Sequence, residues 1–208
     1  MIRTRFAPSP TGYLHVGGLR TALYSYLVAK QAGGDFLLRI EDTDRERHVE
    51  DGTLNILKSL YWAGIVPDEG VCFGKNQESK KSRKQSDTVE ESEITEKGGK
   101  GPYIQSRRLE IYEKYAWELL AKGHAYYCFC TAERLSELRE YQQKNKLPTG
   151  YDGACLKIDP EEAKERTKTE RHVTRLKMPK EGETVFNDLI RGEVRFKKNT
   201  NGHLPATA

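Results

Sequence analysis

Residues 5–18 read RFAPSPTGYLHVGG and separate two different patterns of hydrophobicity. Upstream, apolar residues or threonine alternate with arginine from Ile2 to Phe6, which is the two-residue period of a β-strand. Downstream, apolar residues recur at helical spacing from Leu19 to Leu27. Two prolines and a glycine between these patterns exclude regular structure for about six residues. The stretch is therefore predicted to connect a strand to a helix.

Three residues of special chemistry lie where this helix is expected to begin, namely His15, Gly17 and Gly18. The first turn of a helix presents unpaired backbone N–H groups and the positive end of the helix dipole, and glycines let a phosphate approach the backbone closely. The pattern therefore predicts an anion site, such as a site for nucleotide phosphates. An alternative stays open on these residues alone: the glycines only permit a tight turn, and His15 is an ordinary surface side chain.

A second strand is expected after this helix. Residues 33–35 have the composition of a turn, and residues 36–40 are apolar enough for an interior strand. The order strand, helix, strand predicts an α/β fold with a parallel sheet, whose carboxyl edge is the usual place for ligands. A further helix is predicted over residues 53–61, and Gly64 is expected to close it.

Residues 74–101 differ in kind from those before them. Their only large apolar residues are one valine and one isoleucine, and most of their basic residues precede most of the acidic ones. Such a segment cannot support a core, so we predict a flexible charged insertion. Its basic half either touches nucleic acid or is simply solvated.

The rest of the chain shows helix and strand patterns in turn. Ser106 is predicted to cap a helix over residues 109–120 that stops at Gly123. A change of composition follows, and we expect a domain boundary between residues 125 and 126. Beyond it, the patterns predict helices over 131–144 and after the capping box 159–162, and strands over 172–178 and 192–197.

The composition indicates a globular protein of a reducing compartment. The 208 residues suffice for one large or two small domains, and the net charge of +4 permits an acidic partner without requiring one. No run approaches the roughly 18 apolar residues of a membrane helix, so we expect no membrane contact. We also expect the protein to be cytoplasmic and a monomer. An organellar form whose leader has been removed would have the same features. Four cysteines without a signal peptide favour a metal site over disulfides, and Cys72, far from the other three, is interpreted as structural.

Four blocks of the sequence, in this order, resemble the signature of class I glutamyl-tRNA synthetases. They are residues 8–18 (PSPTGYLHVGG), 36–44 (FLLRIEDTD), 101–106 (GPYIQS) and 127–130 (YCFC). HVGG matches the "HIGH" tetrapeptide of the family, with glycine in the fourth place. The resemblance implies that residues 1–125 form the first half of a Rossmann-type, doubly wound parallel sheet. It also implies that residues 126–208 form an α+β insertion domain that binds the tRNA acceptor stem.

The resemblance further implies ATP-dependent activation of L-glutamate and its ligation to tRNA(Glu), with ATP bound together with Mg²⁺. In this family the helix start holds the ATP phosphates and stabilises the negative charge that develops in the reaction. The residues that would do so here are His15, Gly17 and Gly18, with Thr11 lining the same pocket.

The same resemblance implies a glutamate site made of Arg5, Ala7, Ser9 and Glu41. Arg5 would bind the side-chain carboxylate of the substrate, because the planar fork of arginine offers a carboxylate two parallel hydrogen bonds. Glu41 would pair with the α-ammonium group. Without the resemblance, Glu41 is equally well a solvated carboxylate at the end of a strand.

Three cysteines, Cys128, Cys130 and Cys155, are spaced like the ligands of a zinc site that occurs in some members of the family. The histidine expected as the fourth ligand is replaced by Lys157, which in its protonated form cannot bind a metal. Tyr151 is a candidate replacement, as in truncated relatives that glutamylate a modified base. Three interpretations stay open: zinc bound with Tyr151, a metal-free knuckle, or ordinary buried cysteines.

The chain departs from the family pattern at its last residues. Residues 201–208 lack the expected Gly-x-Pro-Thr-Tyr, and neither the lysine-rich loop nor the anticodon-binding part of the family is present. We therefore expect a fragment that is catalytically incomplete by itself. Two other functions remain open: a glutamyl-Q tRNA(Asp) synthetase-like enzyme, which attaches glutamate to a modified anticodon base, and a non-catalytic tRNA-binding module.

Overall fold

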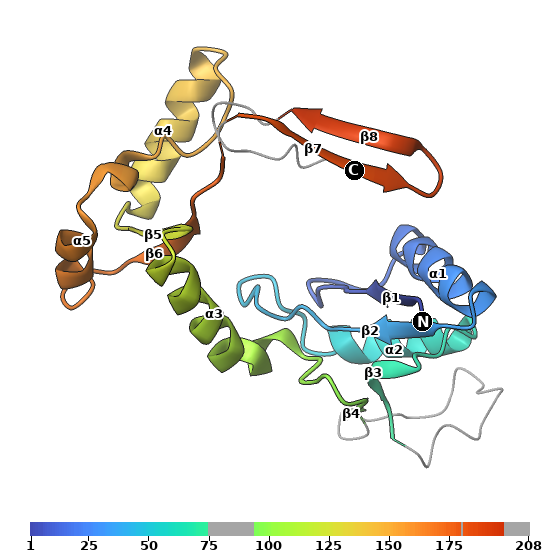
Figure 1. Ribbon diagram of the computed structural model, residues 1–208. Coiled ribbons are helices and arrows are strands. Elements are labelled where there is room, and N and C mark those ends of the chain that lie inside the picture. Colours follow the sequence, from blue (N-terminus) through green and yellow to red (C-terminus); the bar gives the residue numbers. More distant parts are fainter. Residues whose placement is uncertain (75–93, 180, 198–208) are drawn as a thin grey trace. The chain divides into compact units, whose positions relative to one another are not determined.

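The computed structural model of the protein describes residues 1–74, 94–179 and 181–197. The chain divides into two compact units, Met1–Tyr112 and the part that begins at Glu113. Figure 1 shows the elements of both units coloured in chain order. The division falls inside helix α3 (Leu109–Ala121), whereas the boundary inferred from the sequence, between residues 125 and 126, stays a prediction.

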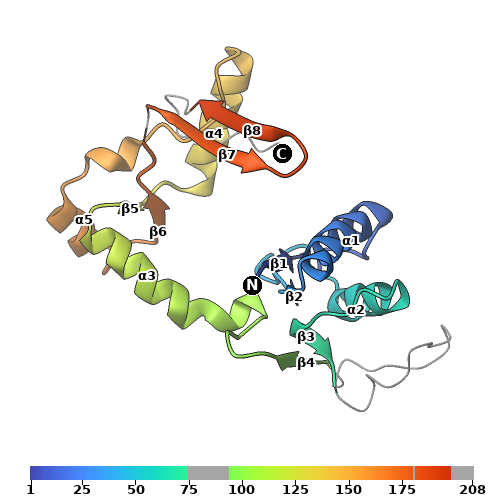
Figure 2. The same ribbon diagram turned by 45° about the vertical axis from the view of Figure 1, so that its right-hand side comes forward.

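The first unit is built around a four-stranded sheet in the order β1–β2–β3–β4 (Figures 1 and 2). The strands are β1 (Arg3–Phe6), β2 (Asp35–Leu38), β3 (Glu69–Phe73) and β4 (Ile94–Lys97). β1, β2 and β3 run parallel and are joined by helices α1 (Val16–Gln31) and α2 (Gly52–Trp62), and β4 is antiparallel to β3. The predicted α/β fold with a parallel sheet is confirmed.

The sheet buries one of its faces. Phe36 and Leu38 of β2 are fully buried, whereas Asp35 and Leu37 are only partly covered. Since parallel neighbours follow one another in chain order, right-handed crossovers place both helices on the same face. The helices complete this core with Ala22, Ala29, Ile56, Leu57 and Leu60.

The prediction that all of 74–101 is a flexible insertion is wrong for residues 94–97. Ile94–Lys97 forms strand β4, which pairs with all but the first residue of β3. Ile94 packs against the core, and the Glu96 carboxylate accepts a hydrogen bond from the backbone N–H of Tyr103. An edge strand needs only one covered face and a paired backbone, so a charged sequence can form it. Residues 75–93, including the basic half, lie outside the described residues.

The predicted cap at Ser106 is also wrong. Residues Gln105–Arg108 form a short 3-10 helix that leads directly into α3. Both the backbone N–H and the hydroxyl of Ser106 donate to the Asp42 carboxylate, at 2.8 and 2.6 Å. A carboxylate is the stronger acceptor, so the serine side chain acts as a donor to a distant residue and not as an acceptor for its own helix.

The second unit combines the second part of α3 with two antiparallel strand pairs and two further helices. Its elements are β5 (Ala125–Cys128), α4 (Ala132–Lys144), a 3-10 helix (Ala154–Lys157), α5 (Pro160–Arg166), β6 (Val173–Leu176), β7 (Glu183–Asp188) and β8 (Gly192–Lys197). β5 pairs with β6, and β7 with β8. The predicted capping box of α5 is confirmed, since the side chain of Asp159 accepts backbone N–H groups of the first turn. The helix predicted over 131–144 is α4, and Thr131 is its N-cap. No helix in the described ranges is long and apolar enough to cross a bilayer.

Candidate functional site

The start of α1 is shaped by a single histidine. His15 is the N-cap, and its Nδ1 accepts a hydrogen bond from the backbone N–H of Gly17 at 3.1 Å. A nitrogen that accepts cannot also carry a proton, so the neutral imidazole holds its proton on Nε2. The side chain is exposed. His15 therefore presents an N–H donor at the positive end of a helix, where an anion is favoured.

The two glycines make room for neighbouring side chains. A Cβ on Gly17 would lie 2.9 Å from Cε1 and 3.0 Å from Nδ1 of His15. A Cβ on Gly18 would lie 2.8 Å from Cδ1 of Leu14. Both distances are well inside ordinary contact, which begins at roughly 3.5 Å. Gly17 thus lets the imidazole fold back onto the first turn of α1.

The loop between β1 and α1 is anchored on α2 and the residues before it. The Tyr13 hydroxyl donates to Asp51 at 3.0 Å, and the Leu14 N–H donates to the Asn55 side chain at 2.9 Å. The Pro10 carbonyl accepts from Val49 N–H at 2.9 Å. Thr11 lies within this fixed loop and is partly exposed. These contacts hold the loop in place without regular structure.

The predicted glutamate residues share one face at the carboxyl edge of the sheet. Arg5 pairs with Leu37 in register, and the strands continue past their ends, since the Phe6 carbonyl accepts from Arg39 N–H at 3.1 Å and the Pro8 carbonyl from Glu41 N–H at 2.9 Å. Side chains alternate between faces, and Phe6 lies on the buried one. The opposite face therefore collects Arg5, Ala7, Ser9, Arg39 and Glu41.

Glu41 has a partner that the sequence reading missed. Arg39 Nη2 lies 2.5 Å from Glu41 Oε1, and both side chains are partly covered. Arg39 Nε is buried and has no hydrogen-bond partner among the described residues. The sequence could have predicted this pair, because Arg39 and Glu41 are two residues apart and such residues lie on the same face of an extended segment. Arg39 orients the Glu41 carboxylate and adds a second cation to this face.

Three of the four sequence blocks meet at this edge. The Ile40 N–H donates to the Tyr103 carbonyl, and the Ile40 carbonyl accepts from Gln105 N–H, both at 2.9 Å. Residues 103–105 thus lie beside 39–41, which in turn lie beside the segment after β1. The fourth block, residues 127–130, belongs to the second unit.

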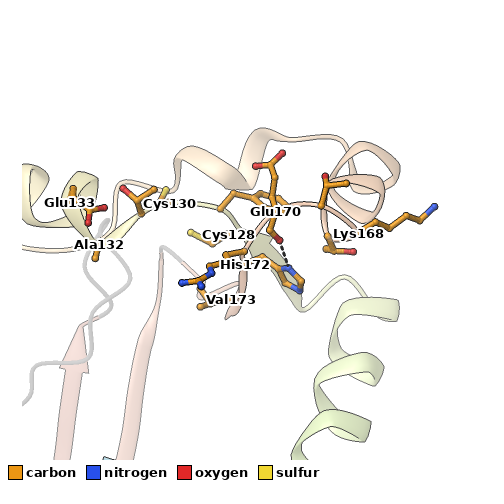
Figure 3. Close-up of a pocket in the computed structure, with 13 residues that line it drawn as sticks. Cys128, Cys130, Ala132, Glu133, Lys168, Glu170, His172 and Val173 are labelled. Atoms are coloured by element: carbon orange, nitrogen blue, oxygen red, sulfur yellow. Dashed lines mark hydrogen bonds between the residues drawn. The ribbon is translucent and has the colours of Figure 1, made fainter. Parts of the chain in front are cut away.

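A cavity of about 900 Å³ lies in the second unit beside this fourth block (Figure 3). Its walls are residues 128–133 and 167–173. The ring of His172 is held by a 3.1 Å hydrogen bond between Nδ1 and the Glu170 carbonyl, and its centroid is 6.0 Å from that of Phe129. Aromatic rings in an open cavity offer faces on which a nucleic-acid base can stack.

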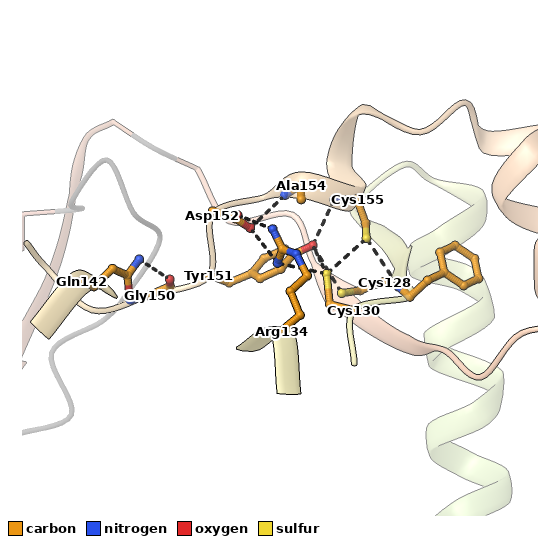
Figure 4. A network of polar contacts seen from close by, with 10 residues as sticks. Cys128, Cys130, Arg134, Gln142, Gly150, Tyr151, Asp152, Ala154 and Cys155 are labelled. Atoms are coloured by element: carbon orange, nitrogen blue, oxygen red, sulfur yellow. Dashed lines mark hydrogen bonds and ion pairs between the residues drawn. The ribbon is translucent and has the colours of Figure 1, made fainter. Parts of the chain in front are cut away.

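The cysteines of the second unit converge on Tyr151 (Figure 4). The Sγ atoms of Cys128, Cys130 and Cys155 lie within 4.8 Å of one another, and those of Cys130 and Cys155 are 3.6 Å apart. The Tyr151 hydroxyl oxygen is 3.3 Å from Cys128 Sγ and 3.4 Å from Cys130 Sγ. Lys157 is exposed in the adjacent 3-10 helix, and Cys72 is buried in β3 of the first unit.

These distances fit a metal site. Ligand atoms of a tetrahedral zinc site with Zn–S of 2.3 Å lie roughly 3.8 Å apart. Two of the three cysteines are partly exposed, which does not match ordinary buried cysteines. The cluster of three sulfurs is thus able to hold a metal ion, with the tyrosine oxygen in position as a fourth ligand.

The charge state of the cluster follows from its surroundings. Burial by itself raises the pKa of the Cys128 thiol, but the neighbouring polar groups of Tyr151, the Cys130 backbone and Arg175 outweigh it and lower the pKa to about 7. The pKa of Cys130 is raised by burial and by the neighbouring sulfurs. Burial and the same sulfurs raise the pKa of Tyr151 well above its usual range. Cys128 is therefore the most readily ionised of the three groups.

A family model of class I tRNA synthetases (E and Q), catalytic domain, matches residues 1–206. The glutamate–tRNA ligase of Finegoldia magna is 50% identical over 201 residues, which are 95% of this chain and 38% of that protein. That of Clostridioides difficile is 44% identical over 199 residues, 95% of this chain and 37% of that protein. The crystal structure of a glutamate tRNA ligase from Elizabethkingia meningosepticum in complex with its amino acid superposes with a TM-score of 0.73 at 38% identity, covering 96% of this chain and 37% of that one. The chain thus spans little more than a third of the length of these relatives.

Proposed function

The chain belongs to the family of class I tRNA synthetases for glutamate and glutamine, and from this premise we propose that it carries the first half of the active site of a glutamate–tRNA ligase. One observation supports this most directly. The register of β1 and β2 gathers Arg5, Ser9 and Glu41 on one face, and the loop after β1 leads directly to a helix start capped by His15. Arg5 and Ser9 of the proposed amino-acid site thus lie on the same continuous segment as the proposed phosphate site, and Glu41 joins them from the segment after β2.

The proposed reaction joins glutamate to AMP. The α-carboxylate of glutamate attacks the α-phosphate of ATP, pyrophosphate leaves, and Mg²⁺ supplies charge neutralisation on the phosphates. This chemistry depends mainly on positioning and on stabilising negative charge. His15 contributes a donor at Nε2, and Gly17 leaves the room in which its imidazole folds back onto the first turn of α1, with Thr11 in the preceding loop.

Selection of glutamate is assigned to charges at the sheet edge. The exposed guanidinium of Arg5 would receive the side-chain carboxylate with two parallel hydrogen bonds. Glu41, held by Arg39, would receive the α-ammonium group, and Ala7 and Ser9 would line the space between them. Glutamine offers an amide in place of the carboxylate, so Arg5 would discriminate against it.

The second unit is proposed to bind zinc through Cys128, Cys130, Tyr151 and Cys155. A bound zinc ion would contribute folding free energy by joining β5, the loop after α4 and the 3-10 helix. The contact distances and the donor types support this interpretation over a metal-free knuckle. The ion would take no part in the chemical step.

The second unit is also proposed to meet the 3′ end of the tRNA, as the α+β insertion that the sequence suggests. The cavity lined by Phe129 and His172 supports this, because rings on which a base would stack lie in the same cavity as basic side chains such as Lys168 and Arg171. Such side chains would hold phosphates and make binding salt-dependent without reading a base sequence.

The test measures binding of a non-hydrolysable glutamyl-adenylate analogue by calorimetry. We expect Arg5→Gln and His15→Ala each to weaken binding, whereas Arg20→Gln, an exposed position on α1, leaves it unchanged. Equal affinity for the glutaminyl analogue, or no effect of Arg5→Gln, would contradict the assignment. If the protein binds tRNA but not the analogue, it is a tRNA-binding module. If a charging assay finds glutamate attached to an anticodon base of the tRNA, the enzyme is of the glutamyl-Q type.

A further inference from the structure

Two arginines that no sequence motif contains point at the cysteine cluster. Arg134 lies in the first turn of α4, and Arg175 lies in β6. We propose that these guanidinium groups are part of the metal site: they offset the excess negative charge of the cluster and so raise its affinity for zinc. This inference rests on the zinc site proposed above.

The charge count gives the physical reason. Three thiolates around one divalent cation leave a net charge of −1, and a tyrosine that releases its proton to water on binding the metal adds another. Cys128 is buried, with 1% of its surface exposed, so water cannot compensate this charge there. A partly buried excess charge is costly unless an opposite charge is hydrogen-bonded to it.

Arg134 is aimed at one sulfur by a carboxylate. Its Nη1 donates to Cys130 Sγ at 3.3 Å, and its Nη2 lies 2.5 Å from Asp152 Oδ2 (Figure 4). Asp152 is itself fixed, because its Oδ1 accepts the Ala154 N–H at 3.2 Å. The backbone N–H of Arg134 donates to the hydroxyl of the N-cap Thr131. Asp152 therefore fixes the guanidinium of Arg134, and the hydrogen bond to Thr131 fixes its backbone.

Arg175 reaches the cluster from the partner strand. It stands opposite Tyr126 in the β5–β6 pair, two residues before Cys128. Its guanidinium carbon lies 4.3 Å from the centroid of the Tyr151 ring. Although burial by itself lowers the pKa of Arg175, the neighbouring Cys128 thiol raises it, which places the positive charge beside this sulfur. Its Nε is buried and has no hydrogen-bond partner within the described ranges.

The arrangement gives the cluster two cations, one hydrogen-bonded to Cys130 and the other packed on the ring of Tyr151. Hydrogen-bonded outer partners orient metal ligands and tune the metal, and removing one such partner typically lowers metal affinity about 10- to 100-fold. A merely structural role for the arginines would affect folding but not the zinc dissociation constant of the folded protein. Zinc affinity is therefore the quantity to measure.

The experiment determines zinc affinity by competition with a chromophoric chelator, with circular dichroism as the control for folding. We expect Arg134→Gln and Arg175→Gln each to raise the zinc dissociation constant about 10- to 100-fold. Arg139→Gln, an exposed position on the same helix α4, serves as the matched control and should leave it unchanged. Arg134→Lys and Arg175→Lys keep the charge and should lose less than the glutamine variants.

Folded glutamine variants that bind zinc within about threefold of the wild type would overturn this inference and leave the zinc site intact. A wild-type protein that binds no zinc would overturn both. Where Arg134→Gln fails to fold, Asp152→Asn decides, because it removes the carboxylate that aims Arg134 at Cys130. Where Arg175→Gln fails to fold, Arg175→Met decides, because it removes the charge and keeps an apolar stem of similar length. Zinc binding weakened at least tenfold in the folded substitute supports the role, and binding within about threefold of the wild type contradicts it.

Discussion

The substitution Gly17→Ala separates two roles of the α1 helix start, namely its contribution to stability and its placement of the His15 imidazole for activity. A Cβ there would lie 2.9 Å from His15 Cε1, so the imidazole must retreat by roughly 0.6 Å to reach ordinary contact. Loss of the 3.1 Å cap bond costs about 1 kcal/mol, and the better helix propensity of alanine returns a similar amount. The free energy of unfolding should therefore change by less than about 1 kcal/mol.

Activity should respond very differently. A misplacement of about 1 Å in a positioned group can reduce a rate about 100-fold, so we expect a loss of this order in glutamate-dependent exchange of pyrophosphate into ATP. Gly12→Ala is the matched control, because a Cβ on Gly12 meets nothing within 4 Å. Stability is read from denaturant unfolding followed by circular dichroism. An exchange rate for Gly17→Ala equal to that of Gly12→Ala would refute the assigned role of the imidazole.

Three further predictions concern charges. Arg5→Gln should raise the dissociation constant of glutamate about 10- to 100-fold and leave that of ATP unchanged, as measured by calorimetry; equal losses for both would contradict its role in selection. Zinc affinity, measured by chelator competition, should fall as the pH drops through about 7, because protons then compete with the metal for the Cys128 thiolate; a flat profile between pH 6 and 8 would count against thiolate ligation. Asp68→Asn should lower the free energy of unfolding by about 1 kcal/mol, since this carboxylate accepts the Phe36 N–H at 2.8 Å and pairs with Lys30. Despite partial burial, these partners lower its pKa, so its contribution is present above pH 3.8 and should vanish in strong acid, where the variant and the wild type should converge.

The glycines of the HVGG block have a structural reason that differs from the one their sequence suggests. The pattern predicts a close approach of phosphate to the backbone. The contact that requires Gly17 is internal, however, because its missing Cβ leaves room for the imidazole of His15. The histidine and the glycine thus form one unit, which explains why they belong together in a single short block.

The helix starts and ends were predictable because they depend on neighbouring residues. Asp159 caps a helix, as expected, and Gly64 and Gly123 follow α2 and α3 with φ of 72° and 69°. Ser106 shows the limit of this reasoning, because its hydroxyl binds Asp42, 64 residues away. A local rule fails where a distant group is the stronger partner.

Strands β3, β4, β5 and β7 were not predicted as strands. β3 is a short buried run between glycines, and β4 is charged and pairs along one edge. A strand is stabilised by its neighbours in the sheet more than by its own composition, so short strands leave little signal in the sequence. Because β4 is charged like the residues before it, the sequence pattern led to its interpretation as part of the charged insertion.

The sequence by itself determined the parallel sheet, the helix start at His15 and the set of cysteines with Tyr151, because each depends on a short period or a compact motif. Only the tertiary structure decided which of these residues meet. Strand register places Glu41 beside Ser9 and pairs it with Arg39, and the β5–β6 pair brings Arg175 to Cys128 across 46 intervening residues. The physical reason is that contacts between distant segments depend on the path of the whole chain, which local patterns of hydrophobicity and charge do not encode.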